Sequence, residues 1–322
     1  MNYKTVFSGL AAIAMCFVGN RVHADFSLTD EAGKLTVRDG EEPVLVYNYE
    51  PVQAPEGVDA HFTRSSYLHP VYSPNGSVVT QDFPDDHYHH RGIFWGWPMT
   101  RIGDRIIDIW ALAGAHPRFD RWLAKQSSAE SATVAVENVW LFDDDPWPKV
   151  REQVYITVWT ADGGTRAIDF LLRFQNITNE IFTIQGQDDE DSKQKVMKGY
   201  GGFNFRPDKS RAPFTFYGKD GVIAEDVLWM DTPWTAITWK EDDSGPVCGV
   251  ATFQHPSNPD YPHGGWILRH YGFLGVSWPH TKAVVVEPAD YIELRYRVLL
   301  FQGTVEEARV ADRFKAYAEP SK

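Results

Sequence analysis

The sequence predicts an all-β protein, a large antiparallel β-sandwich of the supersandwich or jelly-roll-like kind with a short C-terminal helix. Short segments of alternating or aromatic residues recur along the chain, and Gly, Pro, Asn or Asp punctuates the gaps between them. In 153–159, Val154, Ile156 and Val158 fall on one strand face, as period-2 alternation requires. The segment 185–198 lacks apolar periodicity and predicts a solvated loop without a chemical role. We expect strands at 44–49, 93–97, 133–142, 153–159, 167–174, 214–217, 236–239 and 247–254.

The last part of the chain predicts a hairpin followed by the one clear helix. The segments 283–287 and 291–301 are separated by Pro288-Ala289-Asp290, a plausible hairpin connection. Thr304 and Glu307 then match a capping box ahead of apolar residues at helical spacing. We expect this helix to pack across a sheet.

The first 24 residues have the features of a secretory signal peptide. Lys4 precedes an apolar run at 6–18, and small residues at 22 and 24 predict cleavage after Ala24. Cys16 lies inside the apolar run, so a lipid anchor is not expected. Residues 25–322 contain no repeat or long linker and predict one β-sandwich domain. The mature protein is therefore expected to be periplasmic or secreted.

Composition excludes several classes of protein. The net charge of -13 becomes -15 when Lys4 and Arg21 leave with the signal, which argues against a nucleic-acid partner. No later apolar run reaches the roughly 18 to 20 residues that cross a bilayer, so we expect no membrane span. Removal of Cys16 leaves Cys248 alone, which rules out an intrachain disulfide in the mature chain. Dinucleotide-binding, nucleophile-elbow and zincin motifs are absent from the sequence.

Histidines occur with Tyr, Arg and Asn in four short motifs. These are Tyr67-x-His69-Pro70, Pro84-x-Asp86-His87-x-His89-His90-Arg91-Gly92, His255-Pro256-x-Asn258 and Arg269-x-Tyr271-Gly272. A single His or Arg in a β protein is more often a hydrogen-bonded structural side chain. Four motifs of this mixed composition make a purely structural role less satisfactory.

With these motifs the sequence resembles the PmoA-like family of exported proteins, over nearly all of the mature chain. The usual label of that family, methane oxygenase, does not fit a chain without the membrane spans of a membrane monooxygenase. Members are found beside carbohydrate-degrading proteins. The resemblance therefore implies sugar chemistry by association only.

Proton transfer is the leading interpretation of the histidines, because imidazole titrates near neutral pH. Elimination next to a uronate carboxylate needs a base, a donor for the leaving oxygen and a cation. His89 is the expected base, with His87 beside it, and Tyr271 is the expected donor. Arg91 or Arg269 is the expected cation. The predicted function is thus an exported lyase or dehydratase that acts on an oligosaccharide or polysaccharide fragment, with fragments that contain uronic acid among the candidate substrates.

Other residues are predicted to bind the sugar. Trp95 and Trp97 share a strand face just after the histidines and could offer it aromatic surfaces. The Gly-rich segment 199–206 lacks the features of a phosphate loop and supplies Asn204 and Arg206 as candidate ligands. The remaining candidates come from the motifs: Tyr67, His69, His255, Asn258 and Arg269.

Strand geometry predicts to which face each side chain of the histidine cluster points. In an extended strand, His87, His89 and Arg91 point to one face while His90 points to the other. His87 and His89 could then hold a divalent metal, although the carboxylate that a cupin-like oxygenase adds shortly afterwards is missing, and Asp86 or His255 would have to replace it. We expect no cofactor other than this alternative metal.

Three further functions remain open. A glycoside hydrolase could use two of the carboxylates Asp82, Asp85, Asp86, Asp260 and Glu287. A non-catalytic sugar-binding module would use the same residues only as ligands. A metal-dependent oxygenase or hydrolase would require His87 and His89.

Overall fold

The structure, a computed structural model, describes residues 25–241 and 245–319. The predicted signal peptide, 1–24, lies outside the described residues. The described residues form three antiparallel sheets and one α-helix, α1 (Val310–Ala318). The 8-stranded sheet has the order β1 (Phe26–Glu31), β2 (Lys34–Asp39), β3 (Glu42–Asn48), β4 (Tyr67–Val71), β5 (Ile93–Gly96), β13 (Gly202–Phe205), β19 (Phe273–Val276), β18 (Trp266–Arg269).

The other two sheets contain the remaining strands. The 9-stranded sheet has the order β15 (Gly221–Ile223), β14 (Thr215–Gly218), β16 (Trp234–Lys240), β17 (Val247–Gln254), β21 (Tyr291–Gln302), β11 (Thr165–Asn176), β10 (Asp145–Trp159), β9 (Ser131–Phe142), β8 (Ala115–Ser127). The 4-stranded sheet has the order β20 (Val284–Val286), β12 (Phe182–Ile184), β6 (Thr100–Ile102), β7 (Arg105–Ile107).

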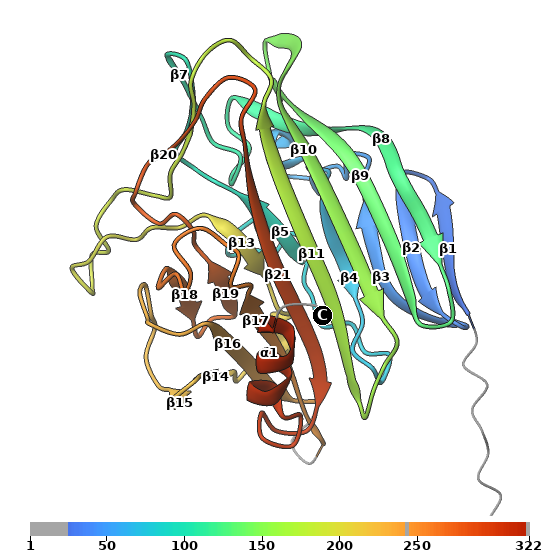
Figure 1. The fold of residues 1–322 in the computed structure, drawn as a ribbon. Coiled ribbons are helices and arrows are strands. Elements are labelled where there is room, and N and C mark those ends of the chain that lie inside the picture. The colour runs from blue at the N-terminus through green and yellow to red at the C-terminus, as the bar shows by residue number, and fades with distance from the viewer. Residues whose placement is uncertain (1–24, 242–244, 320–322) are drawn as a thin grey trace, which may run out of the picture.

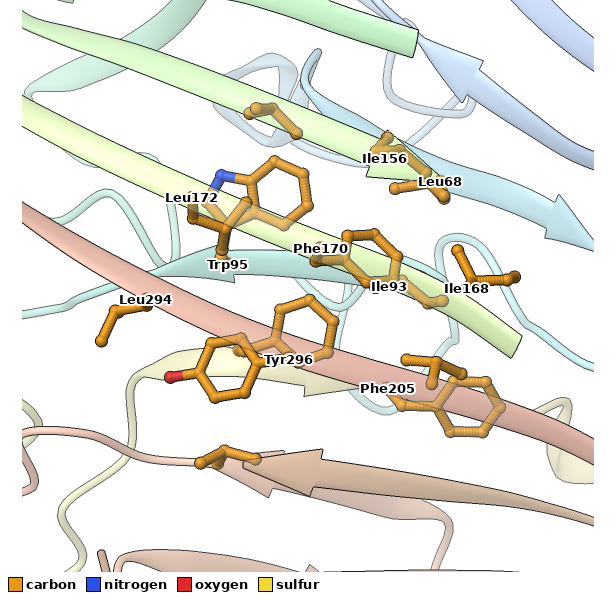
Figure 2. Close-up of a cluster of buried hydrophobic side chains, with 14 of the residues drawn as sticks. Leu68, Ile93, Trp95, Ile156, Ile168, Phe170, Leu172, Phe205, Leu294 and Tyr296 are labelled. Atoms are coloured by element: carbon orange, nitrogen blue, oxygen red, sulfur yellow. The ribbon is translucent and has the colours of Figure 1, made fainter. Parts of the chain in front are cut away.

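The two large sheets form the layers of a sandwich, with the long strands β8 to β11 and β21 in front of β1 to β5 (Figure 1). Inward side chains of both layers meet in one core, where Trp95 and Phe205 of the 8-stranded sheet lie near Phe170 and Tyr296 of the other (Figure 2). Burial of this apolar surface is the main force that holds the layers together. The predicted fold class is confirmed.

Alternation along the strands was predicted correctly, whereas one pairing was wrong. Val154, Ile156 and Val158 of β10 face the core and are at most 1 % exposed. The expected hairpin does not form, because β20 pairs with β12 while β21 lies between β11 and β17. A turn does follow β20, with Asp290 N donating to Glu287 O, but it carries the chain from one sheet to another.

The C-terminal helix has its predicted cap and its predicted place. Thr304 N donates to Glu307 Oε2, and Glu307 N donates to Thr304 Oγ1, which is a reciprocal capping box. Arg309 then adopts a left-handed conformation with φ 52°, so the regular helix begins at Val310. The helix lies on the outer face of the 9-stranded sheet (Figure 1). Its Phe314 and Tyr317 pack against an apolar cluster that includes Phe253.

The expectations about disulfides and membrane spans can be compared with the described residues only. Cys248 of β17 is buried and has no disulfide partner among them. No helix in the described ranges is both long enough and apolar enough to span a membrane.

Candidate functional site

The candidate site lies on the outer face of the 8-stranded sheet, away from the main core. Phe94 of β5, Ile267 of β18 and Phe273 of β19 alternate with core residues and form a second apolar cluster with Trp110. Loops above this cluster enclose a pocket of about 250 Å³. Its lining residues are His87, His89, His90, Pro98, Asp108, Trp110, Ala111, Gln187, Tyr200, Tyr271 and Phe273.

The histidines come from two consecutive turns rather than from a strand. His87 N donates to Pro84 O, and His90 N donates to His87 O. The rings of His87 and His90 consequently stack at 4.6 Å with an interplanar angle of 3°, and His89 lies nearly perpendicular to His90. The prediction that His87 and His89 share a face opposite His90 was therefore wrong, since all three side chains line one pocket.

Arg206 lies beneath the pocket and is linked to His87 through Asp86. Its side chain is fully buried, and Nη2 donates to both carboxylate oxygens of Asp86, at 2.7 and 2.9 Å. Partial burial opposes ionisation of Asp86, but Arg206 outweighs it and holds the pKa of that carboxyl below its ordinary value. Asp86 Oδ2 lies 3.1 Å from His87 Nδ1, although not in hydrogen-bond alignment. Arg206, Asp86 and His87 thus form a row of neighbouring side chains, and the imidazole of His87 at its end lines the pocket.

Tyr271 completes the stack of rings. Its phenol ring lies 5.0 Å from the His87 ring at 13°, and the Arg206 guanidinium lies 5.1 Å from the phenol centroid. Burial, followed by the neighbouring Tyr200, raises the pKa of Tyr271 despite nearby cations. Tyr271 therefore remains protonated at neutral pH and can act as a donor.

Burial keeps the imidazoles of His89 and His90 neutral and favours the protonated form of the Asp108 carboxyl. Burial, and then His87, lowers the pKa of His89 to about 3. Burial also holds the pKa of His90 well below its ordinary value, and Arg206 Nη1 donates to His90 Nδ1 at 3.4 Å, so this nitrogen is an acceptor. Burial raises the pKa of Asp108, whose Oδ1 accepts from Ala111 N.

Tyr200 joins the pocket to a further arginine. Arg269, only 6 % exposed, donates to the Tyr200 hydroxyl oxygen from Nε at 3.0 Å and from Nη2 at 2.6 Å. Nη2 also contacts Asp191, which belongs to the loop that was predicted to have no chemical role. Arg269 was expected to be a ligand, and it instead lies behind a tyrosine that lines the pocket.

Arg91 does not present a cation to the pocket, contrary to prediction. It is fully buried, and its guanidinium donates to the backbone carbonyls of Tyr88 and Phe62 and pairs with Asp82. The same carboxylate accepts the hydroxyl of Tyr67, which is also fully buried. Both residues therefore anchor the turn segment that carries the histidines.

Other predicted sugar ligands are structural or lie outside the pocket. His69 Nδ1 is hydrogen-bonded to Thr80 Oγ1, and His69 does not line the pocket. Trp95 and Trp97 are at most 2 % exposed and belong to the main core, so they cannot offer a surface to a sugar (Figure 2 shows Trp95). Asn204 is fully buried, and its amide donates to backbone carbonyls.

His255 and Asn258 belong to a different part of the molecule. His255 lines a separate hollow of about 430 Å³ beside Arg297 and Tyr317, on the outer face of the 9-stranded sheet. Asn258 Nδ2 donates to Arg295 O, and Arg295 N donates to Asn258 Oδ1. Asn258 therefore closes a backbone contact, and neither residue joins the histidine pocket.

The alternative metal site was tested against side-chain geometry. The His87 and His89 rings lie 5.7 Å apart and nearly perpendicular. In residues 25–241 and 245–319, no three His, Cys, Asp or Glu side chains converge as a metal site requires. We assign no metal ligands.

Seven lining residues were not found from the sequence: Pro98, Asp108, Trp110, Ala111, Gln187, Tyr200 and Phe273. Asp108 and Trp110 follow β7 in a short segment without any motif, and Gln187 lies in the charged loop. Tyr200 had a weak signal, because it lies in the Gly-rich segment that led to Asn204 and Arg206. The hydrolysis carboxylates proposed from sequence did not include Asp108.

Comparison with known proteins gives a family without an assigned activity. A family model described as a family of unknown function, DUF6807, matches residues 34–315. The chain belongs to this DUF6807 family. The match includes every lining residue of the pocket. No curated protein matches the chain.

Solved structures give only distant similarity to this DUF6807 chain. An alpha-galactosidase from Lactobacillus brevis has 8 % identity and a TM-score of 0.39, covering 89 % of this chain and 41 % of its own. Heparinase III has 12 % identity and a TM-score of 0.35, covering 87 % and 37 %. A copper-containing benzylamine oxidase from Hansenula polymorpha has 10 % identity and a TM-score of 0.26, covering 89 % and 60 %. This chain thus spans less than half the length of the first two, and scores this low carry no argument about function.

Proposed function

We propose that this protein is an exported carbohydrate-active enzyme that eliminates a group from one sugar unit of an oligosaccharide by proton transfer. The observation that carries the proposal is the chain Arg206–Asp86–His87, which ends against Tyr271 inside the pocket. An imidazole next to an ionised, partly exposed carboxylate and stacked on a protonated phenol is a base paired with an acid.

His87 is the base in this proposal. Asp86 beside Nδ1 stabilises the imidazolium that forms when Nε2 takes a proton, because Asp86 Oδ2 lies 3.1 Å from Nδ1. His89 was the base expected from sequence, but a pKa of about 3 makes it a weak one. His89 therefore serves as a neutral hydrogen-bonding partner of the sugar.

Tyr271 is the acid, because its phenol carries a proton at neutral pH and its ring stacks against the ring of His87 at 5.0 Å. In the elimination, a C–H bond of the sugar breaks and its proton passes to His87. The electron pair forms a carbon–carbon double bond, the bond to the oxygen on the next carbon breaks, and that oxygen takes the proton of Tyr271. The proton on His87 then restores the phenol, so no oxidant or reductant is needed.

The walls of the pocket suit a sugar ring. Trp110 and Tyr200 supply aromatic surface, while Gln187, His87 and His89 supply hydrogen bonds to hydroxyl groups. The volume of about 250 Å³ is below the roughly 300 to 1,000 Å³ of pockets that hold drug-sized ligands. One ring of a longer chain is therefore the expected occupant.

Hydrolysis is the second candidate, and Asp108 favours it. Burial raises the pKa of Asp108, as in the general acid of many glycosidases, and Asp108 lines the pocket. Of the carboxylates expected from sequence, Asp82 is paired with Arg91 and Asp85 with Lys209.

Product analysis after incubation with an oligosaccharide panel tests the proposal. Elimination gives an ultraviolet-absorbing unsaturated sugar, and hydrolysis gives a new reducing end and a gain of water in mass. Elimination that is lost in His87→Ala supports the proposal. Recovery of unchanged ligand from a protein that binds it would instead indicate a sugar-binding module.

A further inference from the structure

The hydroxyl of Tyr200 has an unusual hydrogen-bonding state. Its oxygen accepts from Nε and Nη2 of Arg269, at 3.0 and 2.6 Å, and an arginine has no acceptor to offer in return. No described residue accepts the hydrogen of the Tyr200 hydroxyl. Two charge-assisted bonds to an oxygen polarise its O–H bond and strengthen it as a donor.

This hydroxyl is fixed close to the acid of the proposed reaction. Tyr200 and Tyr271 line the same pocket of about 250 Å³, which places the two phenols near one another. Arg269 is held in turn by Asp191, with Nη2 at 3.1 Å from Oδ2. A donor that is oriented before substrate binds is what stabilisation of a developing oxyanion requires.

The charge of the pocket restricts the ligand. No Arg or Lys side chain is among the residues that line it, whereas Asp108 is. Arg206 is fully buried and satisfied by Asp86, and Arg91 is held by backbone carbonyls and Asp82. A free carboxylate would therefore enter without a partner of opposite charge, which costs free energy in a partly enclosed site.

We propose that Tyr200 donates to an uncharged carbonyl oxygen of the substrate, next to the carbon that loses its proton, with Arg269 as its positioning residue. The substrate class is then a sugar that carries a ring ketone or an esterified uronic acid, rather than a free uronate. This inference rests on the proposed elimination at the same pocket.

The carbonyl also explains how the C–H bond becomes acidic enough to break. His87 takes the proton, and the electron pair moves onto the carbonyl oxygen to give an enolate that the Tyr200 O–H stabilises. Collapse of the enolate forms the carbon–carbon double bond and breaks the bond to the neighbouring oxygen. That oxygen leaves with the proton of Tyr271, so atoms and electrons balance.

Three probes separate the possible carbonyl sources: a glycoside with one ring hydroxyl oxidised to a ketone, a methyl-esterified oligogalacturonide, and the same oligomer after de-esterification. We expect elimination from the ketone or the ester and turnover at least tenfold lower on the free acid. Equal or faster turnover of the free acid would overturn the inference. His87-dependent turnover of a plain oligosaccharide, with none of the carbonyl probes accepted, would also overturn it while leaving acid–base action on sugars intact.

Variants test the role of Tyr200 on whichever carbonyl probe is accepted. Tyr200→Phe should lower kcat by roughly 10² to 10³, the usual effect of removing one oxyanion donor, with KM nearly unchanged. Its melting temperature should fall modestly, because Nε and Nη2 of Arg269 lose their acceptor. Arg269→Lys should retain more activity than Arg269→Gln. The matched control is Tyr291→Phe, an exposed tyrosine beside Arg173 and outside the pocket, which should have no effect. Unchanged kcat in Tyr200→Phe, or a loss explained by unfolding, would contradict the assignment.

Discussion

The imidazole rings of His87 and His90 lie parallel, 4.6 Å apart, although the two residues have different surroundings. His87 is about one-third exposed and contacts Asp86 and Tyr271. His90 is 3 % exposed and stacks on Phe273 behind it. One turn of chain thus provides a reactive imidazole and a structural imidazole, both of which line the pocket.

The first prediction separates these two roles. His87→Ala should lower kcat by roughly 10² to 10⁴, the usual contribution of general acid–base catalysis, with little change in melting temperature. His90→Ala should lower the free energy of unfolding by roughly 1 to 3 kcal/mol, because it removes a buried ring and leaves Arg206 Nη1 without its acceptor. Urea unfolding and steady-state kinetics on each variant measure both effects.

His89→Gln is the comparison for this prediction, because glutamine keeps a neutral hydrogen-bonding group. We expect a change mainly in KM. A larger loss of kcat in His89→Gln than in His87→Ala would return the role of base to His89.

The second prediction uses two adjacent aspartates. Asp86→Asn removes the charge that stabilises protonated His87 and should lower kcat by more than tenfold, since the orientation of a catalytic imidazole depends on such a partner. Asp85→Asn is the matched control, because Asp85 is exposed and pairs with Lys209 instead. Equal kinetics in the two variants would show that Asp86 is only an anchor for Arg206.

Periodicity was sufficient to predict the fold class but not all of its pairings. Strand alternation in 153–159 correctly identified the core face of β10, because a half-buried strand needs one apolar face. The expected hairpin at 283–301 failed because sequence proximity does not determine which sheet a strand joins. β20 is only three residues long and joins β12, far away in sequence.

Residue types identified the site better than residue geometry did. His87, His89 and Tyr271 were predicted and lie in one pocket, and the Gly-rich segment led to Arg206 beneath it. Alternation was the wrong rule for 82–91, where Pro84 begins a turn and backbone bonds follow turn spacing. Whether an arginine such as Arg91 faces solvent or a backbone carbonyl depends on tertiary contacts that spacing does not show.

The third prediction concerns pH. Burial lowers the pKa of folded His89 from 6.5 to about 3, so the unfolded chain binds more protons between those values. The free energy of unfolding should therefore fall as pH falls below about 6.5, by about 2 kcal/mol from pH 7 to pH 5 for this residue. Urea unfolding at the two pH values measures the loss, which should shrink in His89→Gln and persist in the half-exposed control His116→Gln. An equal loss in both variants would contradict the prediction.

The last prediction tests the support of Tyr200 by its neighbour. Gly199 has φ +63°, and a Cβ there would overlap the imidazole of His280, whereas Gly163 has φ +56° with open space around it. Gly163→Ala should cost only the left-handed strain, about 1 kcal/mol in the free energy of unfolding. Gly199→Ala should cost roughly 1 to 3 kcal/mol more, because His280 has to move within a packed region. It should also lower turnover. Tyr200 follows Gly199 directly and lines the pocket, so a shift of the backbone at Gly199 would displace its side chain. If the two variants lose the same free energy of unfolding, His280 can move at no cost. If kcat is unchanged in Gly199→Ala, the position of Tyr200 does not depend on the contact between Gly199 and His280.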